Sequence, residues 1–179
     1  MYILDQFNVP SDFARVLEGK DSTVRAIAQK SLFLKCNSAV YYNNGRMGVF
    51  LSGNRLLTAI SADDRGNVYT SLYDTAIQLG ASKVQMNNTT KAMEITYQGQ
   101  QVQAGITGTT KQYRKALSVM KTTVQLYRNR AMATGAFYQE LTGRKYLQQD
   151  GYLILLPKEV SIDTVQSETL LTIAKELYE

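Results

Sequence analysis

The chain has 179 residues, of which 44% are hydrophobic and 20% charged, and a formal net charge of +5. It contains no histidine and one cysteine, Cys36, which excludes a Ser-His-Asp triad, a Cys-His pair, the usual zinc sites and an internal disulfide. No apolar run approaches the roughly 20 residues that cross a bilayer, and neither a secretory signal nor a nucleotide-binding glycine motif is present. These features predict one domain over residues 1–179, cytoplasmic or virion-associated, without a membrane segment, metal site or cofactor.

Helical patterns fill the first 30 residues, and strand patterns follow them. Ser11 is a suitable N-cap for a helix that Gly19 ends, and a second helix is expected over 22–30. The next three runs are rich in aromatic and aliphatic residues and are separated by Asn-Gly and Ser-Gly turns; they cover 32–42, 46–51 and 55–61. This pattern predicts a three-stranded antiparallel meander.

The middle of the chain alternates between the two patterns. Apolar residues at helical spacing predict a helix over 68–79 that Gly80 ends. A strand is expected over 82–87, and residues 92–106 are strand-like with a turn at Gly99, although residues 92–94 could equally begin a helix.

Residues 100–149 carry eight basic residues and one acid, whereas residues 1–99 have a net charge of +2 and residues 150–179 of −4. Within this basic segment, apolar residues at i, i+3/i+4 and i+7 predict a long amphipathic helix over 109–133. Its apolar face would consist of Tyr113, Ala116, Leu117, Met120, Val124, Tyr127 and Ala131. Its cationic arc would consist of Lys111, Arg114, Lys115, Lys121 and Arg128, with Arg130 at the margin.

Three short elements complete the expected fold. A helix is predicted over 135–142, ending at Gly143, followed by a buried strand over 152–156 that Pro157 ends. The chain closes with an acidic helix over about 163–177 whose apolar residues are Val165, Leu170, Ile173, Ala174 and Leu177. The fold class is therefore α+β, with an antiparallel sheet of five or six strands covered by helices.

The cationic arc has three interpretations. It could bind the phosphates of a nucleic acid, it could be a solvated face, or it could pair with the acidic C-terminal helix of the same chain or of a neighbouring copy in a homo-oligomer. The two tyrosines on the apolar face would point inward, so they would not stack on bases. The sequence contains no specific nucleic-acid-binding motif.

A second constellation lies between residues 57 and 99. A strand, an Arg65-Gly66-Asn67 turn, a helix and another strand come in this order. The arrangement resembles the central motif of the GCN5-related N-acetyltransferases. The resemblance implies that Arg65, Gly66 and Asn67 would hold the pyrophosphate of acetyl-CoA, that Tyr97 would be the acid and that Glu94 could be the base. The family's motif, Arg/Gln-x-x-Gly-x-Gly/Ala, has Val68 and Thr70 here at its two later glycine positions.

Two hypotheses about function follow. The first is a non-catalytic interaction or assembly protein that uses its basic helix to engage nucleic acid or an acidic protein surface. Its tyrosine, asparagine and glutamine content, without histidine or tryptophan, resembles that of phage or other mobile-element proteins. The second is an acetyltransferase-like domain, either active or degenerate.

Overall fold

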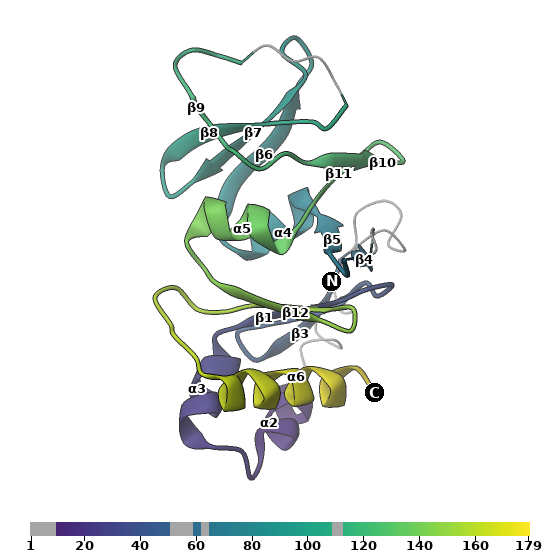
Figure 1. The fold of residues 1–179 in the computed structure, drawn as a ribbon, viewed down its shortest axis with the longest axis vertical. Coiled ribbons are helices and arrows are strands. Elements are labelled where there is room, and N and C mark those ends of the chain that lie inside the picture. The colour runs from purple at the N-terminus through teal and green to yellow at the C-terminus, as the bar shows by residue number, and fades with distance from the viewer. Residues whose placement is uncertain (1–9, 51–58, 62–64, 109–112) are drawn as a thin grey trace.

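The computed structural model describes residues 10–50, 59–61, 65–108 and 113–179 and confirms the α+β class (Figure 1). The described helices are α2 (Pro10–Leu17), α3 (Ser22–Gln29), α4 (Leu72–Gln78), α5 (Gly135–Thr142) and α6 (Thr164–Tyr178). The described strands are β1 (Leu32–Lys35), β2 (Val40–Asn43), β3 (Arg46–Val49), β4 (Ala59–Ser61), β5 (Val68–Ser71), β6 (Ala81–Asn87), β7 (Ala92–Tyr97), β8 (Gln100–Gly105), β9 (Ser118–Val119), β10 (Gln125–Tyr127), β11 (Arg130–Ala133), β12 (Tyr146–Gln149) and β13 (Tyr152–Leu155).

These strands form three sheets where the sequence predicted one. The first has the order β12-β13-β1-β2-β3 and is antiparallel throughout, so it joins strands from both ends of the chain. The second has the order β10-β11-β5-β4, and the third the order β6-β7-β8-β9, in which β9 runs parallel to β8. Of the predicted meander, the antiparallel pairing of the first two runs is confirmed as β2 with β3, although residues 32–42 form two strands, β1 and β2. The third run is wrong as a member of this sheet: residues 51–58 lie outside the described part of the chain, and β4 belongs to the second sheet.

The first sheet separates two hydrophobic cores because successive side chains of a strand point to opposite faces. Phe33 and Ile154 face the core under α2, α3 and α6. Their strand neighbours, such as Leu32 and Leu155, face a second core that α4, α5 and the other two sheets share. Figure 1 shows the resulting layers along the long axis, with α2, α3 and α6 at one end and the third sheet at the other.

Several elements lie where the sequence predicted them. The N-terminal helices, β6, the β7–β8 hairpin with its turn at Gly99, α5 and β13 are confirmed. Helix α6 is also confirmed and begins with a capping box between Asp163 and Gln166. Its predicted inward residues are buried except Val165, which is 70% exposed.

The predicted helix over 68–79 begins later than expected. Residues 68–71 form β5, which pairs with β4 and β11, and α4 starts only at Leu72. The hydroxyl of Ser71 accepts a hydrogen bond from the Asp74 backbone N–H and caps this helix.

The predicted long basic helix is wrong for residues 113–133, and residues 109–112 lie outside the described part of the chain. Residues 113–133 form turns and the short strands β9, β10 and β11. Met120 and Val124 are buried, as the helical pattern predicted, but Tyr113 and Tyr127 are 36% and 40% exposed. Thr122, Thr123 and Val124 are β-branched and favour an extended backbone, and tertiary pairing with β8 decides the outcome.

Candidate interaction surface

Residues 113–130, here called the strap, cross from the third sheet to the second along the outside of the molecule (Figure 1). Of the eleven residues from Ser118 to Arg128, eight are exposed, Thr122 is half-buried, and only Met120 and Val124 are buried. These two side chains anchor the strap in the core, at 7% and 0% exposure. The strap is therefore an extended segment that is held at its buried points and presents most of its side chains to solvent.

Gln103, a fully buried residue of β8, holds the first part of the strap. Its side-chain Nε2 donates to the carbonyl oxygens of Arg114 at 2.7 Å and of Leu117 at 3.1 Å, and its Oε1 accepts from the Arg114 backbone N–H at 2.9 Å. The backbone carbonyl of Gln103 also accepts from the Met120 N–H at 2.8 Å. One buried amide thus supplies hydrogen-bond partners to two carbonyl groups and one N–H group of an irregular turn. Its own polar atoms are bonded in return, as is general for buried polar groups.

Glu140 of α5 holds the middle of the strap. Its carboxylate accepts from the backbone N–H groups of Lys121 and Thr122 at 2.7 and 2.9 Å and from the Thr122 hydroxyl at 2.8 Å. Partial burial acts to raise the pKa of Glu140, but these hydrogen bonds and the Lys121 charge outweigh it and hold that pKa below its ordinary value. The only acid of the basic segment therefore supports the strap in its ionised form.

The last part of the strap is the β10–β11 hairpin. Arg128 and Asn129 form its turn with φ angles of 50° and 66°, the left-handed pair that two-residue hairpin turns require. The Arg128 guanidinium lies 5.4 Å from the ring centroid of Tyr127, a cation–π contact. Leu126 is 44% exposed and lies opposite Ala131 in the register, so the two side chains share one face of the hairpin.

A cleft of about 220 Å³ lies between this hairpin, α4 and the edge of the third sheet. We call it the Met86 cleft; its lining consists of Ser71, Tyr73, Val84, Gln85, Met86, Met93, Asn129, Arg130 and Ala131. None of these residues is acidic. Tyr73, at 53% exposure, and Leu126, on the same face as the lining residue Ala131, extend its apolar border.

The structure distributes the predicted basic residues along the strap and not on one helical arc. Lys111 lies outside the described residues. Arg114 forms an ion pair with Glu94 at 3.4 Å, while Lys115 is exposed in the turn that follows. Lys121 is at the Glu140 contact, Arg128 lies in the hairpin turn and Arg130 is the first residue after it. They share one acid-free segment, although they do not form one compact patch.

The residues that the acetyltransferase resemblance singled out are not brought together. Arg65, Gly66 and Asn67 lie in the connection from β4 to β5, which is followed by a strand instead of a helix N-terminus. Glu94 and Tyr97 lie on β7 three positions apart, so their side chains leave the strand on opposite faces. Glu94 binds Asn87 and Arg114, whereas Tyr97 packs against the core that contains Ile95.

Arg144, another cation of the basic segment, is bound to main-chain carbonyl groups and has a structural role. Its guanidinium donates to the carbonyl oxygens of Leu156 at 2.6 Å and of Lys30 and Leu155 at 3.1 Å each. Burial lowers the pKa of Arg144 below its ordinary value, and the nearby Tyr97 partly offsets this effect. This side chain joins α3 to the end of β13 and is not part of the exposed surface.

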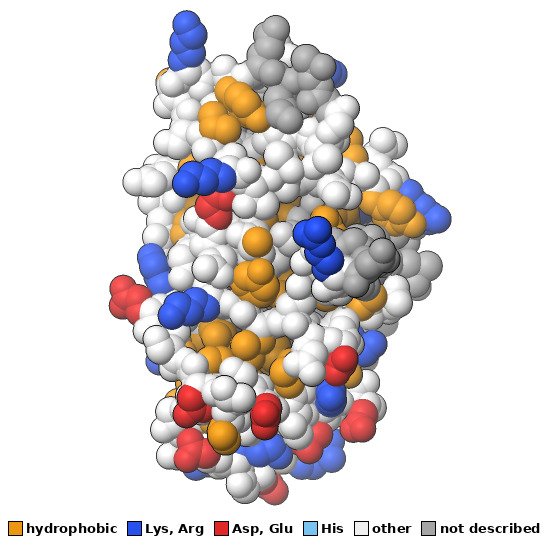
Figure 2. All heavy atoms as spheres, in the orientation of Figure 1, with side chains coloured by type: hydrophobic (Ala, Val, Ile, Leu, Met, Phe, Trp, Pro, Cys, Tyr) orange, Lys and Arg blue, Asp and Glu red, His pale blue; other side chains and the backbone are white. Residues whose placement is uncertain are grey.

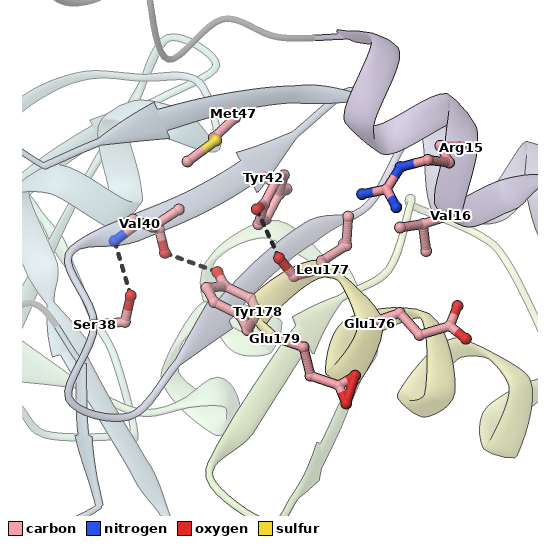
Figure 3. A pocket seen from close by; sticks show the side chains of 10 residues that line it. All are labelled: Arg15, Val16, Ser38, Val40, Tyr42, Met47, Glu176, Leu177, Tyr178 and Glu179. Atoms are coloured by element: carbon pink, nitrogen blue, oxygen red, sulfur yellow. Dashed lines mark hydrogen bonds between the residues drawn. The ribbon is translucent and has the colours of Figure 1, made fainter.

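The cavity drawn in Figure 3 has a volume of about 370 Å³ and lies where the end of α6 meets α2 and the β2–β3 hairpin. Its tyrosine hydroxyls are engaged with the main chain: Tyr42 donates to the Leu177 carbonyl at 2.9 Å and Tyr178 to the Val40 carbonyl at 2.7 Å. Burial raises the pKa of Tyr178 well above its ordinary value, so it remains a donor. The cavity therefore marks the anchoring of α6.

Sequence reasoning identified the basic residues but missed the exposed apolar residues among them. The β-branched run at 122–124 and the Arg128-Asn129 turn were the available signals for strands in place of a helix. Among the described residues, no group of three or more metal-ligating side chains could hold an ion, and no helix is long and apolar enough to cross a membrane. No family model, curated protein or solved structure matches the chain.

Proposed function

We propose that this protein is a non-catalytic interaction or assembly protein and that its strap docks on an acidic protein surface. The observation that carries the proposal is the combination of cationic and large apolar side chains on one exposed segment that has no acid and is held by hydrogen bonds from Gln103 and Glu140. Residues 113–133 include five basic residues and no Asp or Glu. Four of the seven large hydrophobic residues exposed in the described part of the chain also lie there: Tyr113, Val119, Leu126 and Tyr127.

This mixture favours a protein partner over a nucleic acid. Phosphates would attract the cations but would offer nothing to the aliphatic Val119 and Leu126. Burial of these two side chains stabilises a complex only when the partner removes them from water. Aromatic residues and arginine at the centre of a surface are typical of protein–protein hot spots. The hydrogen bonds from Gln103 and Glu140 support the same proposal, because a surface ordered before binding loses less entropy on association.

Binding of two fluorescent probes tests the proposal. The probes are a short peptide that combines glutamate with leucine and a single-stranded oligonucleotide of equal charge. At low salt we expect the peptide to bind more tightly than the oligonucleotide. The double variant Lys115→Glu/Lys121→Glu should lose peptide binding. A matched control, Arg25→Glu/Lys158→Glu, makes the same charge change at exposed residues outside the strap and should retain binding.

Leu126→Ser separates the two partner classes. It should weaken binding of the peptide and leave binding of the oligonucleotide unchanged, because only a protein surface uses the aliphatic contact. Tighter binding of the oligonucleotide that Leu126→Ser does not alter would assign the strap to nucleic acid. If the strap variant and its control bind the peptide equally well, the strap is not the binding surface.

A further inference from the structure

Charge is distributed unequally between the two halves of the molecule. Residues 65–145, which build α4, α5 and most of the second and third sheets, include eleven basic and three acidic residues. The remainder includes nine basic and twelve acidic residues. Figure 2 shows most of the acidic side chains of this face at the lower end, where α6 lies in Figure 1.

The acidic half carries an exposed apolar side chain among its acids. Val165, in the first turn of α6, is 70% exposed and is the most exposed large hydrophobic residue of the described chain. The N-cap Asp163 and the exposed Glu168 lie two positions before it and three positions after it. Residues three apart are neighbours on a helix surface, so Val165 and Glu168 form one apolar and acidic ridge.

The basic half carries a complementary feature. The Met86 cleft is apolar at Val84, Met86 and Met93, is bordered by Tyr73 and Leu126, and has no acidic lining residue. The exposed Arg128 at the hairpin turn supplies positive charge beside it. Asp74 lies next to the lining, where it accepts a hydrogen bond from Ser71 at 2.7 Å.

We propose that copies of this chain associate head to tail, with Val165 of one copy in the Met86 cleft of the next and Glu168 opposite Arg128. This inference rests on the proposed function and names a second copy as the acidic surface. The ridge lies on α6, at one end of the layers in Figure 1. The cleft lies on the other side of the first sheet, between α4, the β10–β11 hairpin and the third sheet, so one copy cannot join its own two surfaces. An interface between two different surfaces produces rings or open filaments and not a closed two-fold dimer.

The test uses one variant for each surface. Val165→Ser/Glu168→Lys removes the ridge, and Leu126→Asp/Arg128→Glu removes the cleft border; all four side chains are exposed, so the fold should survive. Glu179→Lys, the same charge change at the other end of α6, is the matched control. Each double variant should weaken association by roughly tenfold or more, since it removes an apolar contact and reverses an ion pair.

Sedimentation velocity at low salt should detect wild-type assemblies that grow with concentration and dissociate as salt rises. Each double variant alone should sediment as a monomer. Mixed together, they should associate again, with a dimer of one copy of each as the first species, because the ridge variant retains an intact cleft and the cleft variant retains an intact ridge. The Glu179→Lys control should assemble like the wild type.

Wild type that remains monomeric at high concentration and low salt would overturn the inference, as would a mixture that forms no dimer. In either case the proposed function is judged separately by the peptide probe. A monomer that binds the acidic peptide through the strap would retain the function and lose only the second copy as partner. A monomer that binds neither would lose both.

Discussion

Replacing Gln103 by leucine should release the strap while leaving both hydrophobic cores in place. Leucine has a similar size and is compatible with the buried position, but it removes both hydrogen-bonding ends of the amide. The carbonyl groups of Arg114 and Leu117 and the N–H of Arg114 would lose their partner. The main-chain bond from Met120 to the Gln103 carbonyl would remain.

The magnitude follows from the three side-chain hydrogen bonds. Each contributes roughly 0.5–1.5 kcal/mol net, so opening the strap should become easier by roughly 2–4 kcal/mol. The orphaned groups lie on an exposed turn and can bind water, so the loss of global stability should fall at or below the lower end of this range.

Native-state hydrogen exchange measures this opening directly. The Met120 amide is the reporter, because its own acceptor is unchanged and its exchange reports movement of the strap. A cost of 2–4 kcal/mol corresponds to exchange that is roughly 30- to 1,000-fold faster. Gln101→Leu, at an exposed position of the same strand, is the control and should leave the exchange rate unchanged.

Unchanged Met120 exchange in Gln103→Leu would contradict the role of the Gln103 amide, because the strap would then be held by its buried anchors alone. A uniform increase at every amide would also refute it, since that pattern indicates global destabilisation and not release of one segment.

Three further results are expected. The pKa of Glu140 is lowered in the folded protein, so its contribution is complete above pH about 4.5 and is lost as pH falls through the folded-state pKa. As pH falls through that window, strap exchange relative to the intrinsic exchange rate at each pH should rise, and Glu140→Gln should abolish most of this pH dependence. Arg144→Met should lower the free energy of unfolding in urea by roughly 2–4 kcal/mol because it removes charge-assisted bonds to three carbonyl groups, whereas Lys145→Met, at an exposed neighbour, should change it little; equal effects would contradict this role. Acetyl-CoA at roughly 1 mM should leave the melting temperature unchanged, and a clear rise would favour the acetyltransferase interpretation.

Local chemistry predicted many of the elements correctly. The turn at Gly99 and the C-terminal glycine Gly143 each act within a few residues of the chain, so the sequence contains what is needed to place them. The sequence also contained a signal for the start of α4. Ser71 and Asp74 have the spacing of an N-terminal cap, but the apolar period that begins at Val68 concealed it.

The strap could not be predicted because its conformation depends on distant residues. Met120 and Val124 are four positions apart, a spacing that suits one helical face and equally an extended chain pinned at two points. The choice between them is made by Gln103 and Glu140, which lie outside the strap. A local pattern contains no information about such partners.

The sequence therefore predicted which basic residues belong to the candidate surface, but it did not predict how they are arranged. The charge excess of residues 100–149 directed attention to Arg114, Lys115, Lys121, Arg128 and Arg130. The inward orientation expected for Tyr113 and Tyr127 was wrong, and so the apolar part of the surface was missed. The exposure of Val165 was missed for the same reason, since a helical period does not distinguish a buried face from its margin.

The most direct test of the central claim is a hydrogen-exchange footprint of the acidic, leucine-containing peptide on the wild-type protein. The strap hypothesis predicts that saturating peptide slows exchange at residues 118–130 and leaves the amides of α2 and α3 unchanged. Protection restricted to the half of the molecule that contains α6, or no protection anywhere under conditions in which the peptide binds, would contradict it.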